Sequence, residues 1–167
     1  AYWHTGHLRR QEWLQQNEEI GWLNGYYDEE GQRLEGEHPA GVRMTLTGQV
    51  FALMSGVATD DQARQIVRAA DRYLYDRDVG GYRLNTDFRR DSARLSMSLG
   101  RCFGFAFGHK ENGAMFSHMA VMYAYALYAR GLPAEGWKAR SGIYRHCQDF
   151  PRAAMYPGLP EYVNARG

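Results

Sequence analysis

Two pairs of helical segments constrain what this chain can fold into more than any other feature of its sequence. Apolar residues recur at intervals of three and four in both pairs, and a short connection joins the members of each pair. The first pair begins with a helix predicted from about Val42 to Ser55. Thr59 and Gln62 then form the capping-box pattern that starts its partner. Short connections make such helices antiparallel neighbours, so the sequence predicts helical hairpins.

The second helical hairpin is predicted to begin near Met115 and is the more apolar of the two. Its first helix is apolar on nearly every side, which is typical of a buried helix. Gly131 ends that helix, and Pro133 suits the first turn of the next one. The residues expected to anchor this last helix in the core are Trp137, Ile143, Tyr144 and Cys147.

The remaining stretches are predicted to be less regular. Residues 7–20 are polar and compatible with a helix, whereas the aromatic residues of 22–27 favour an extended segment or hairpin. Residues 28–31 then predict a turn. Residues 80–107 lie between the helical hairpins, and long irregular connections inside a compact domain are usually functional. The pattern predicts a mainly α-helical chain forming an α/α toroid, or part of one, with a single domain over residues 1–167.

Charge and composition argue against several classes of protein. The formal net charge of +1 is unlike that of a dedicated nucleic-acid binder, which usually carries a basic excess. No apolar stretch approaches membrane-spanning length and no signal-peptide pattern is present, so we expect no membrane contact from this segment. Cys102 and Cys147 favour reduced thiols in a cytoplasmic protein, although a secreted chain that has lost its signal stays open. The histidines lack metal-type spacing, so no metal is expected.

Aromatic residues are unusually frequent, at 14% with four tryptophans and twelve tyrosines. Flat rings stack against the C–H faces of pyranoses, so sugar binding is one explanation. The other is that tyrosine and tryptophan bridge a wet surface and a packed interior. Composition alone favours the second explanation.

A polar run directly before the second helical hairpin is the strongest functional signal in the sequence. Between two glycines it comprises His109, Lys110, Glu111 and Asn112, and His118 follows in the first turn of the predicted helix. Free backbone N–H groups and the helix dipole favour an anionic or hydroxyl-rich ligand at such a helix start. The alternative is a charged surface loop followed by a helix cap.

Two segments carry a resemblance to a known family. Residues 110–118 resemble the K-E-N-G-(A/G)-x-(F/Y)-x-H motif of the cellobiose and chitobiose phosphorylases, glycoside hydrolase family 94, which also includes phosphorylases of β-1,2-glucans. Residues 49–56 are similar to the Q-x-W-A-x-x-S-G helix of that family, with Phe51 where many members have tryptophan. The first motif is fairly specific when this helix and residues 81–84 with residues 100–101, which also match in order and spacing, accompany it.

The resemblance extends from about residue 22 to residue 166, and it includes residues 81–84 followed by residues 100–101. It implies that residues 1–167 are the C-terminal half of an (α/α)6 catalytic barrel. The family's general acid is an aspartate in a D-W-N-D-like segment, and a Leu-Thr-Gly-Ser sequence forms its second phosphate-binding element. This sequence contains neither. We therefore expect a fragment of a longer enzyme, without a catalytic acid of its own and inactive by itself.

The resemblance also assigns roles to individual residues. His118 is expected to contact the attacking phosphate, and Glu111 is expected to bind the sugar. The other substrate-binding candidates are Lys110, Asn112, Gln49 and Arg83.

Each assignment has a structural alternative. His118 could simply pack beside Phe116, and Gln49 could be a buried glutamine satisfied within the protein. Asn112 could shape the turn, and Arg83 could belong to an ordinary edge strand.

The reaction that the resemblance implies is inverting phosphorolysis of a β-linked gluco-oligosaccharide, which gives a sugar 1-phosphate. Inorganic phosphate is then a co-substrate, and no cofactor is expected. The alternatives are a phosphorylase-like domain of a cyclic β-1,2-glucan synthase and a non-catalytic carbohydrate-binding or scaffold module. Residues 85–88 replace a Pro-Pro-(Tyr/Phe) sequence of cellobiose-type members, and residues 105–109 replace a proline-rich approach to the motif. Together with residues 44–49, these segments look more like the β-1,2-oligoglucan phosphorylase branch. A homodimer is an open option, because a second copy would cover apolar faces of a half-barrel.

Overall fold

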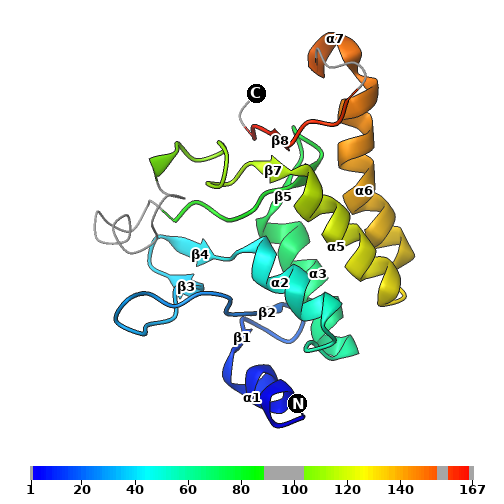
Figure 1. Cartoon of the computed structure of the whole chain (residues 1–167). Helices are drawn as coiled ribbons and strands as arrows, with labels where there is room; N and C mark the ends of the chain where they lie inside the picture. The colour runs from blue at the N-terminus through cyan, green and yellow to red at the C-terminus, as the bar shows by residue number, and fades with distance from the viewer. Residues whose placement is uncertain (1, 89–103, 154–157, 166–167) are drawn as a thin grey trace.

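The computed structural model describes residues 2–88, 104–153 and 158–165, and helices make up most of its regular structure (Figure 1). Short antiparallel strand pairs accompany the helices. In chain order the elements are α1 (Tyr2–Gln11), β1 (Trp13–Gln15), β2 (Gly21–Leu23), β3 (Gly36–His38), β4 (Gly41–Arg43), α2 (Leu46–Met54), α3 (Asp60–Tyr73), β5 (Tyr75–Asp76), β6 (Gly81–Tyr82), β7 (Met115–Phe116), α5 (Ser117–Ala129), α6 (Pro133–Gln148), α7 (Phe150–Ala153) and β8 (Tyr162–Val163). The mainly α-helical class is therefore confirmed.

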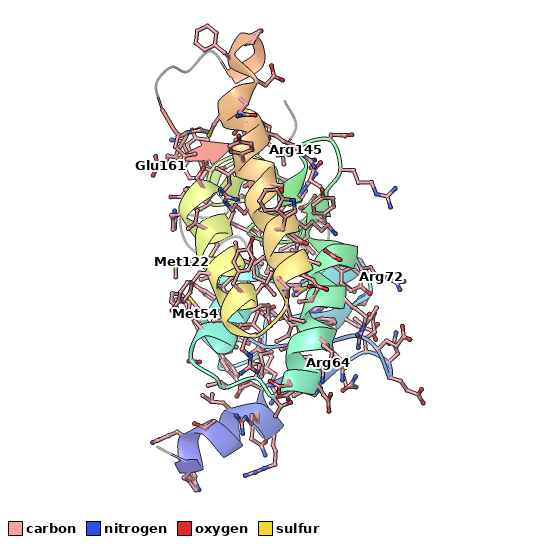
Figure 2. The ribbon with its side chains drawn as sticks, turned by 90° about the vertical axis from the view of Figure 1, so that its right-hand side faces the viewer. Met54, Arg64, Arg72, Met122, Arg145 and Glu161 are labelled. Atoms are coloured by element: carbon pink, nitrogen blue, oxygen red, sulfur yellow. The ribbon has the colours of Figure 1, made fainter. Side chains whose placement is uncertain are left out.

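The two predicted helical hairpins form the body of the molecule. Helices α5 and α6 pack along each other, and α2 packs against α5. In Figure 2, α2 with Met54 lies beside α5 with Met122, and α3 with Arg64 and Arg72 lies on the side of α6. Strands β3 and β4 and the connections near them lie on the opposite side of the molecule from α6 (Figure 1).

The first helical hairpin is confirmed, but its first helix is shorter than predicted. It begins at Leu46, because residues 41–43 pair with residues 36–38 as an antiparallel ladder instead of joining the helix. The capping box of the partner helix is present. The Thr59 hydroxyl accepts a hydrogen bond from the Gln62 backbone N–H at 3.2 Å, and the Thr59 N–H donates to the Gln62 side chain at 3.0 Å.

The second helical hairpin begins two residues later than predicted. Met115 and Phe116 form β7, which pairs with Val163 and Tyr162 of β8, so α5 begins at Ser117. The predicted end signals are confirmed. Gly131 follows α5 in the left-handed region with φ of 71°, and Pro133 is the first residue of α6.

The prediction of a helix through residues 7–20 is wrong beyond Gln11. Helix α1 ends there, and β1 pairs with β2 in the register Trp13 to Leu23. This pairing buries Trp22, which is 1% exposed and lies edge-on to the Tyr73 ring of α3. Burial of the large indole against α3 therefore outweighs the local helical preference of a short polar segment.

Aromatic rings and an ion pair join the elements at the centre of the molecule. The ring of Tyr82 lies edge-on to the buried ring of Tyr123 with centroids 5.1 Å apart. The hydroxyl of Tyr82 donates to Asp71, which also accepts a hydrogen bond from Lys138 at 2.6 Å. Strand β6 and helices α3, α5 and α6 are thereby connected through Tyr82.

The expectation that α5 is buried on all sides is wrong. Val121 is 50% exposed and Tyr125 is 62% exposed, because α5 contacts α2 and α6 with only part of its circumference. Only some of the residues predicted to anchor α6 in the core are buried. Ile143 is buried, whereas Trp137 is more than half exposed and Tyr144 is about half exposed. Apolar side chains on the outer parts of these helices are left uncovered by the part of the chain that the structure describes.

A close approach of α6 to the turn before β6 gives a test of the packing. A Cβ atom at Gly142 would lie 2.4 Å from the carbonyl oxygen of Gly80, so alanine there requires the helix to move. Gly142→Ala is expected to lower the free energy of unfolding by about 1–3 kcal/mol, as overpacking does. Gly6→Ala is the matched control, since its Cβ atom would meet only the flexible Arg10 side chain. Equal urea midpoints for the two variants would contradict the packing.

Candidate functional site

The polar loop of residues 108–113 is organised around a buried side chain. Asn112 has no exposed surface, and its amide nitrogen donates to the Phe105 carbonyl at 2.8 Å. Its amide oxygen accepts a hydrogen bond from the side chain of Asn85 at 3.2 Å. The backbone N–H of Gly108 donates to the Asn112 carbonyl at 2.7 Å and closes the loop. The side chain of Asn112 therefore acts within the protein, which favours the turn-shaping alternative for this residue.

The backbone of the same loop adopts conformations that favour glycine. Lys110 has a φ of 45°, and it is the only non-glycine residue with positive φ in the described ranges. Its ammonium lies 5.0 Å from the centroid of the Phe105 ring, a cation–π distance. Gly113 has a φ of 83°, and a Cβ atom there would lie 2.5 Å from the Phe107 ring. Strained residues of this kind are concentrated at functional sites, so this geometry supports a functional role for the loop.

Glu111 of this loop lies in the wall of a cavity of about 510 Å³, named here the main cavity. The lining combines aromatic rings, hydroxyl groups, a side-chain amide and a carboxylate, which suits a ligand with both C–H faces and hydroxyl groups. The lining residues are Gly25, Tyr26, Thr45, Thr47, Gly48, Phe51, Leu84, Asn85, Phe88 and Glu111. Segments far apart in the sequence therefore meet at one concave site.

The start of α2 supplies one wall of the main cavity. Thr47, Gly48 and Phe51 all belong to α2 and line the cavity, and the Phe51 side chain is about half exposed. Thr45 stands at the N-cap but makes no side-chain cap. A helix start carries a partial positive charge, so this wall favours oxygen-rich ligands.

Glu35 is a buried carboxylate beside this wall, and it was not among the residues predicted for the site. It is 3% exposed and accepts hydrogen bonds from the Gly25 N–H at 2.9 Å, the Thr45 N–H at 2.9 Å and the Thr45 hydroxyl at 2.7 Å. Burial raises the pKa of Glu35 to about 7, although these hydrogen bonds act in the opposite direction. No motif or periodicity marks Glu35, so only the folded arrangement identifies it.

Gln49 follows Gly48 of the cavity wall in the chain but uses its own amide inside the protein. Its oxygen accepts from the Leu23 N–H at 2.9 Å, and its nitrogen donates to the Leu23 carbonyl at 2.7 Å. The side chain has no exposed surface. The arrangement matches the structural alternative for Gln49, in which α2 pairs with the backbone of β2.

Arg83 faces a different cavity, of about 330 Å³, whose lining includes Tyr75, Asp87 and Phe107. Its guanidinium forms an ion pair with Asp76 and lies 4.9 Å from the centroid of the Phe107 ring. The structure therefore does not bring Arg83 and Glu111 to the same cavity.

His118 is the second residue of α5, so its predicted position in the first helical turn is confirmed. Its side chain is exposed. Its ring lies edge-on to that of Phe116, with centroids 5.6 Å apart, and Phe116 stacks on Tyr162. His118 is not among the residues that line the main cavity. The structure therefore does not place His118 in the cavity that Glu111 lines, and phosphate binding by His118 stays a prediction.

Comparison with known families identifies the chain. A family model described as the catalytic domain of the glycosyl hydrolase 94 superfamily matches residues 9–149. The chain belongs to the glycosyl hydrolase 94 superfamily. No curated protein matches it.

Membership of the glycosyl hydrolase 94 superfamily makes this a chain of a carbohydrate-active enzyme family, and the match covers every candidate site residue from Gln49 to His118. Among the described residues, no helix combines the length and apolar character needed to cross a membrane. Within the same ranges, no group of three or more histidine, cysteine, aspartate or glutamate side chains is placed to hold a metal ion. Arg101 and Cys102 lie outside the described residues.

The buried carboxylate of Glu35 predicts a pH-dependent stability. Its pKa is raised in the folded protein, so folding favours the protonated form, and this contribution is full below about pH 4.5 and lost as the pH rises through about 7. The loss amounts to about 3 kcal/mol. The free energy of unfolding of the protein should therefore fall, relative to that of Glu35→Gln, between about pH 4.5 and about pH 8 in urea titrations. Parallel pH profiles for the two proteins would contradict the raised pKa.

Proposed function

We propose that this chain is part of an inverting glycoside phosphorylase, which cleaves β-linked gluco-oligosaccharides with inorganic phosphate and releases a sugar 1-phosphate. The observation that carries the proposal is the position of Glu111. This carboxylate belongs to the loop that resembles the family motif, and it lies in one cavity with the rings of Tyr26 and Phe51. Membership of the glycosyl hydrolase 94 superfamily supports the same class of reaction.

The proposed reaction needs one acid and one oxyanion. A carboxylic acid protonates the glycosidic oxygen as the bond to the anomeric carbon breaks, and a phosphate oxygen forms a bond to that carbon from the opposite face. Inverting hydrolases need a second carboxylate to activate water. Phosphate is already an anionic nucleophile, so donors that hold it replace the base. The acid in this proposal is an aspartate from a part of the protein outside these residues.

We assign the phosphate to His118. Its imidazole is exposed in the first turn of α5, where the helix dipole favours an anion. The edge contact with Phe116 and the stacking of Phe116 on Tyr162 hold the ring near the end of β7. An imidazole held in this way can donate a hydrogen bond to a phosphate oxygen without closing the path to solvent.

We assign sugar binding to the main cavity. The Glu111 carboxylate can accept hydrogen bonds from sugar hydroxyls while the Tyr26 and Phe51 rings offer faces for stacking. Asn85 and Phe88 also line this cavity, and they belong to the stretch that differs from the cellobiose-type pattern. This supports the β-1,2-oligoglucan branch, because a changed wall changes which linkage fits. Lys110 and Asn112 contribute mainly by holding the loop that carries Glu111.

The proposed architecture is the C-terminal half of an (α/α)6 barrel, over residues 1–167 of a cytoplasmic enzyme without a cofactor. Its support is the pair of packed helical hairpins and the exposed apolar residues of α5, such as Val121 and Tyr125. Side chains of this kind are rarely left in water in large patches. Further helices of the same barrel would cover them.

Replacing His118 tests the phosphate assignment. In the full-length enzyme, His118→Ala should raise the KM for inorganic phosphate about tenfold, since it removes a hydrogen bond to a charged group. The KM for the oligosaccharide should change much less. His7→Ala is the control, because His7 is an exposed histidine of α1. An unchanged phosphate KM in steady-state kinetics would contradict the assignment.

Replacing Glu111 tests the sugar assignment. Glu111→Gln should lower kcat/KM for oligosaccharide phosphorolysis by about ten- to a hundredfold, because sugar hydroxyls lose a charged acceptor. The exposed Glu18, far along the chain from the loop, gives the control Glu18→Gln. If both variants retained the wild-type kcat/KM, Glu111 would not contact the substrate.

A further inference from the structure

Residues 24–35 form a hairpin that carries part of the wall of the main cavity. The Leu34 N–H donates to the Tyr26 carbonyl at 3.1 Å, Tyr27 forms a β-bridge with Arg33, and Asp28 begins the turn at the tip. This hairpin loops out beside β3 and β4, away from α5 and α6 (Figure 1). Tyr26 lies near its base and lines the main cavity with about half of its side chain exposed.

The carboxylate of Glu35 joins the two strands of the hairpin base to the start of α2. One oxygen accepts from both the Gly25 N–H and the Thr45 hydroxyl, and the other accepts from the Thr45 N–H. The backbone N–H of Glu35 in turn donates to the side chain of Asn24 at 3.3 Å. Gly25 and Thr45 both line the main cavity, whereas Glu35 does not.

Two glycines make this junction unusually close. A Cβ atom on Gly25 would lie 3.1 Å from the Cα atom of Gly48, and the reverse distance is the same. The hairpin base and the first turn of α2 are therefore in backbone contact, with no side chain between them. Any group that pushes them apart would widen the main cavity at Tyr26.

We infer that Glu35 is a positioning residue for oligosaccharide binding, which fixes the hairpin of residues 24–35 against α2 and so sets the distance between Tyr26 and the α2 wall of the main cavity. The inference rests on the proposed function of that cavity. A carboxylate suits this position because it accepts all three hydrogen bonds, whereas a glutamine amide presents N–H groups to at least one of these donors. Its burial costs stability, so a purely structural role would be filled more favourably by an uncharged side chain.

The test is Glu35→Gln in the full-length enzyme, assayed at about pH 8 so that the carboxylate of the wild type is ionised. We expect the KM for the oligosaccharide to rise about tenfold, because the wall that stacks on the sugar is no longer fixed. The kcat and the KM for phosphate should stay within about twofold of the wild type. Asp71→Asn is the control, since Asp71 is bound to Tyr82 and Lys138 and does not line the main cavity.

Glu35→Asp is the second variant and decides the question if Glu35→Gln does not fold. It keeps a carboxylate but shortens the side chain by one methylene group, so it cannot reach the Gly25 N–H and the Thr45 donors together and should raise the oligosaccharide KM in the same selective way. Folded variants with an unchanged oligosaccharide KM, or with kcat and both KM values altered together, would overturn the inference. A wild-type enzyme without phosphorolytic activity would instead overturn the proposed function.

Discussion

The side-chain amide of Asn112 joins the polar loop to Phe105, seven residues away in the chain, and to Asn85, 27 residues away. It binds Phe105 before the polar loop and Asn85 after β6, while the loop carbonyl of Asn112 accepts from Gly108. These contacts lie in the interior, where hydrogen bonds are least weakened by water and most costly to leave unmade. Glu111 directly precedes Asn112, so these contacts hold the backbone that carries the Glu111 side chain in the wall of the main cavity.

The main cavity combines a firmly held loop with a wall that depends on a buried charge. The loop of residues 108–113 is held by neutral hydrogen bonds, whereas the hairpin of residues 24–35 is held by the Glu35 carboxylate. Burial disfavours the ionised form of Glu35 and raises its pKa to about 7. Sites that bind ligands commonly retain such unfavourable groups, because position matters there more than stability.

Local sequence signals were sufficient to predict the helical hairpins but not to predict where every helix begins and ends. The Thr59 capping box, Gly131 and Pro133 act through contacts within a few residues, and the structure has each of them as predicted. The predictions for the start of α2 and the end of α1 were wrong, because β4 pairs with β3 before α2 and β1 pairs with β2 after α1. Trp137 and Tyr144 were assigned to the core on apolarity alone, which does not tell which side of a helix meets a neighbour.

Only part of the candidate site could likewise be predicted from the sequence. The motif loop with Glu111 could be located from the sequence, and the structure adds the cavity that it faces. Tyr26 and Thr45 could not be assigned to that cavity in advance, since the hairpin of residues 24–35 has to fold onto α2 before they meet. Gln49 and Asn112 illustrate the converse. Their positions in family-like motifs suggested ligand contacts, yet their amides bind the backbone of Leu23 and Phe105.

In the proposed function, the cavity that Glu111 lines holds a β-linked glucose oligosaccharide for attack by phosphate. The most direct measurement is proton and phosphorus NMR of the full-length enzyme incubated with a panel of β-linked glucose disaccharides and oligosaccharides, with and without inorganic phosphate. We expect an α-configured sugar 1-phosphate that forms only when phosphate is present. Release of free sugar at the same rate without phosphate, or no cleavage of any β-linked glucoside, would contradict it.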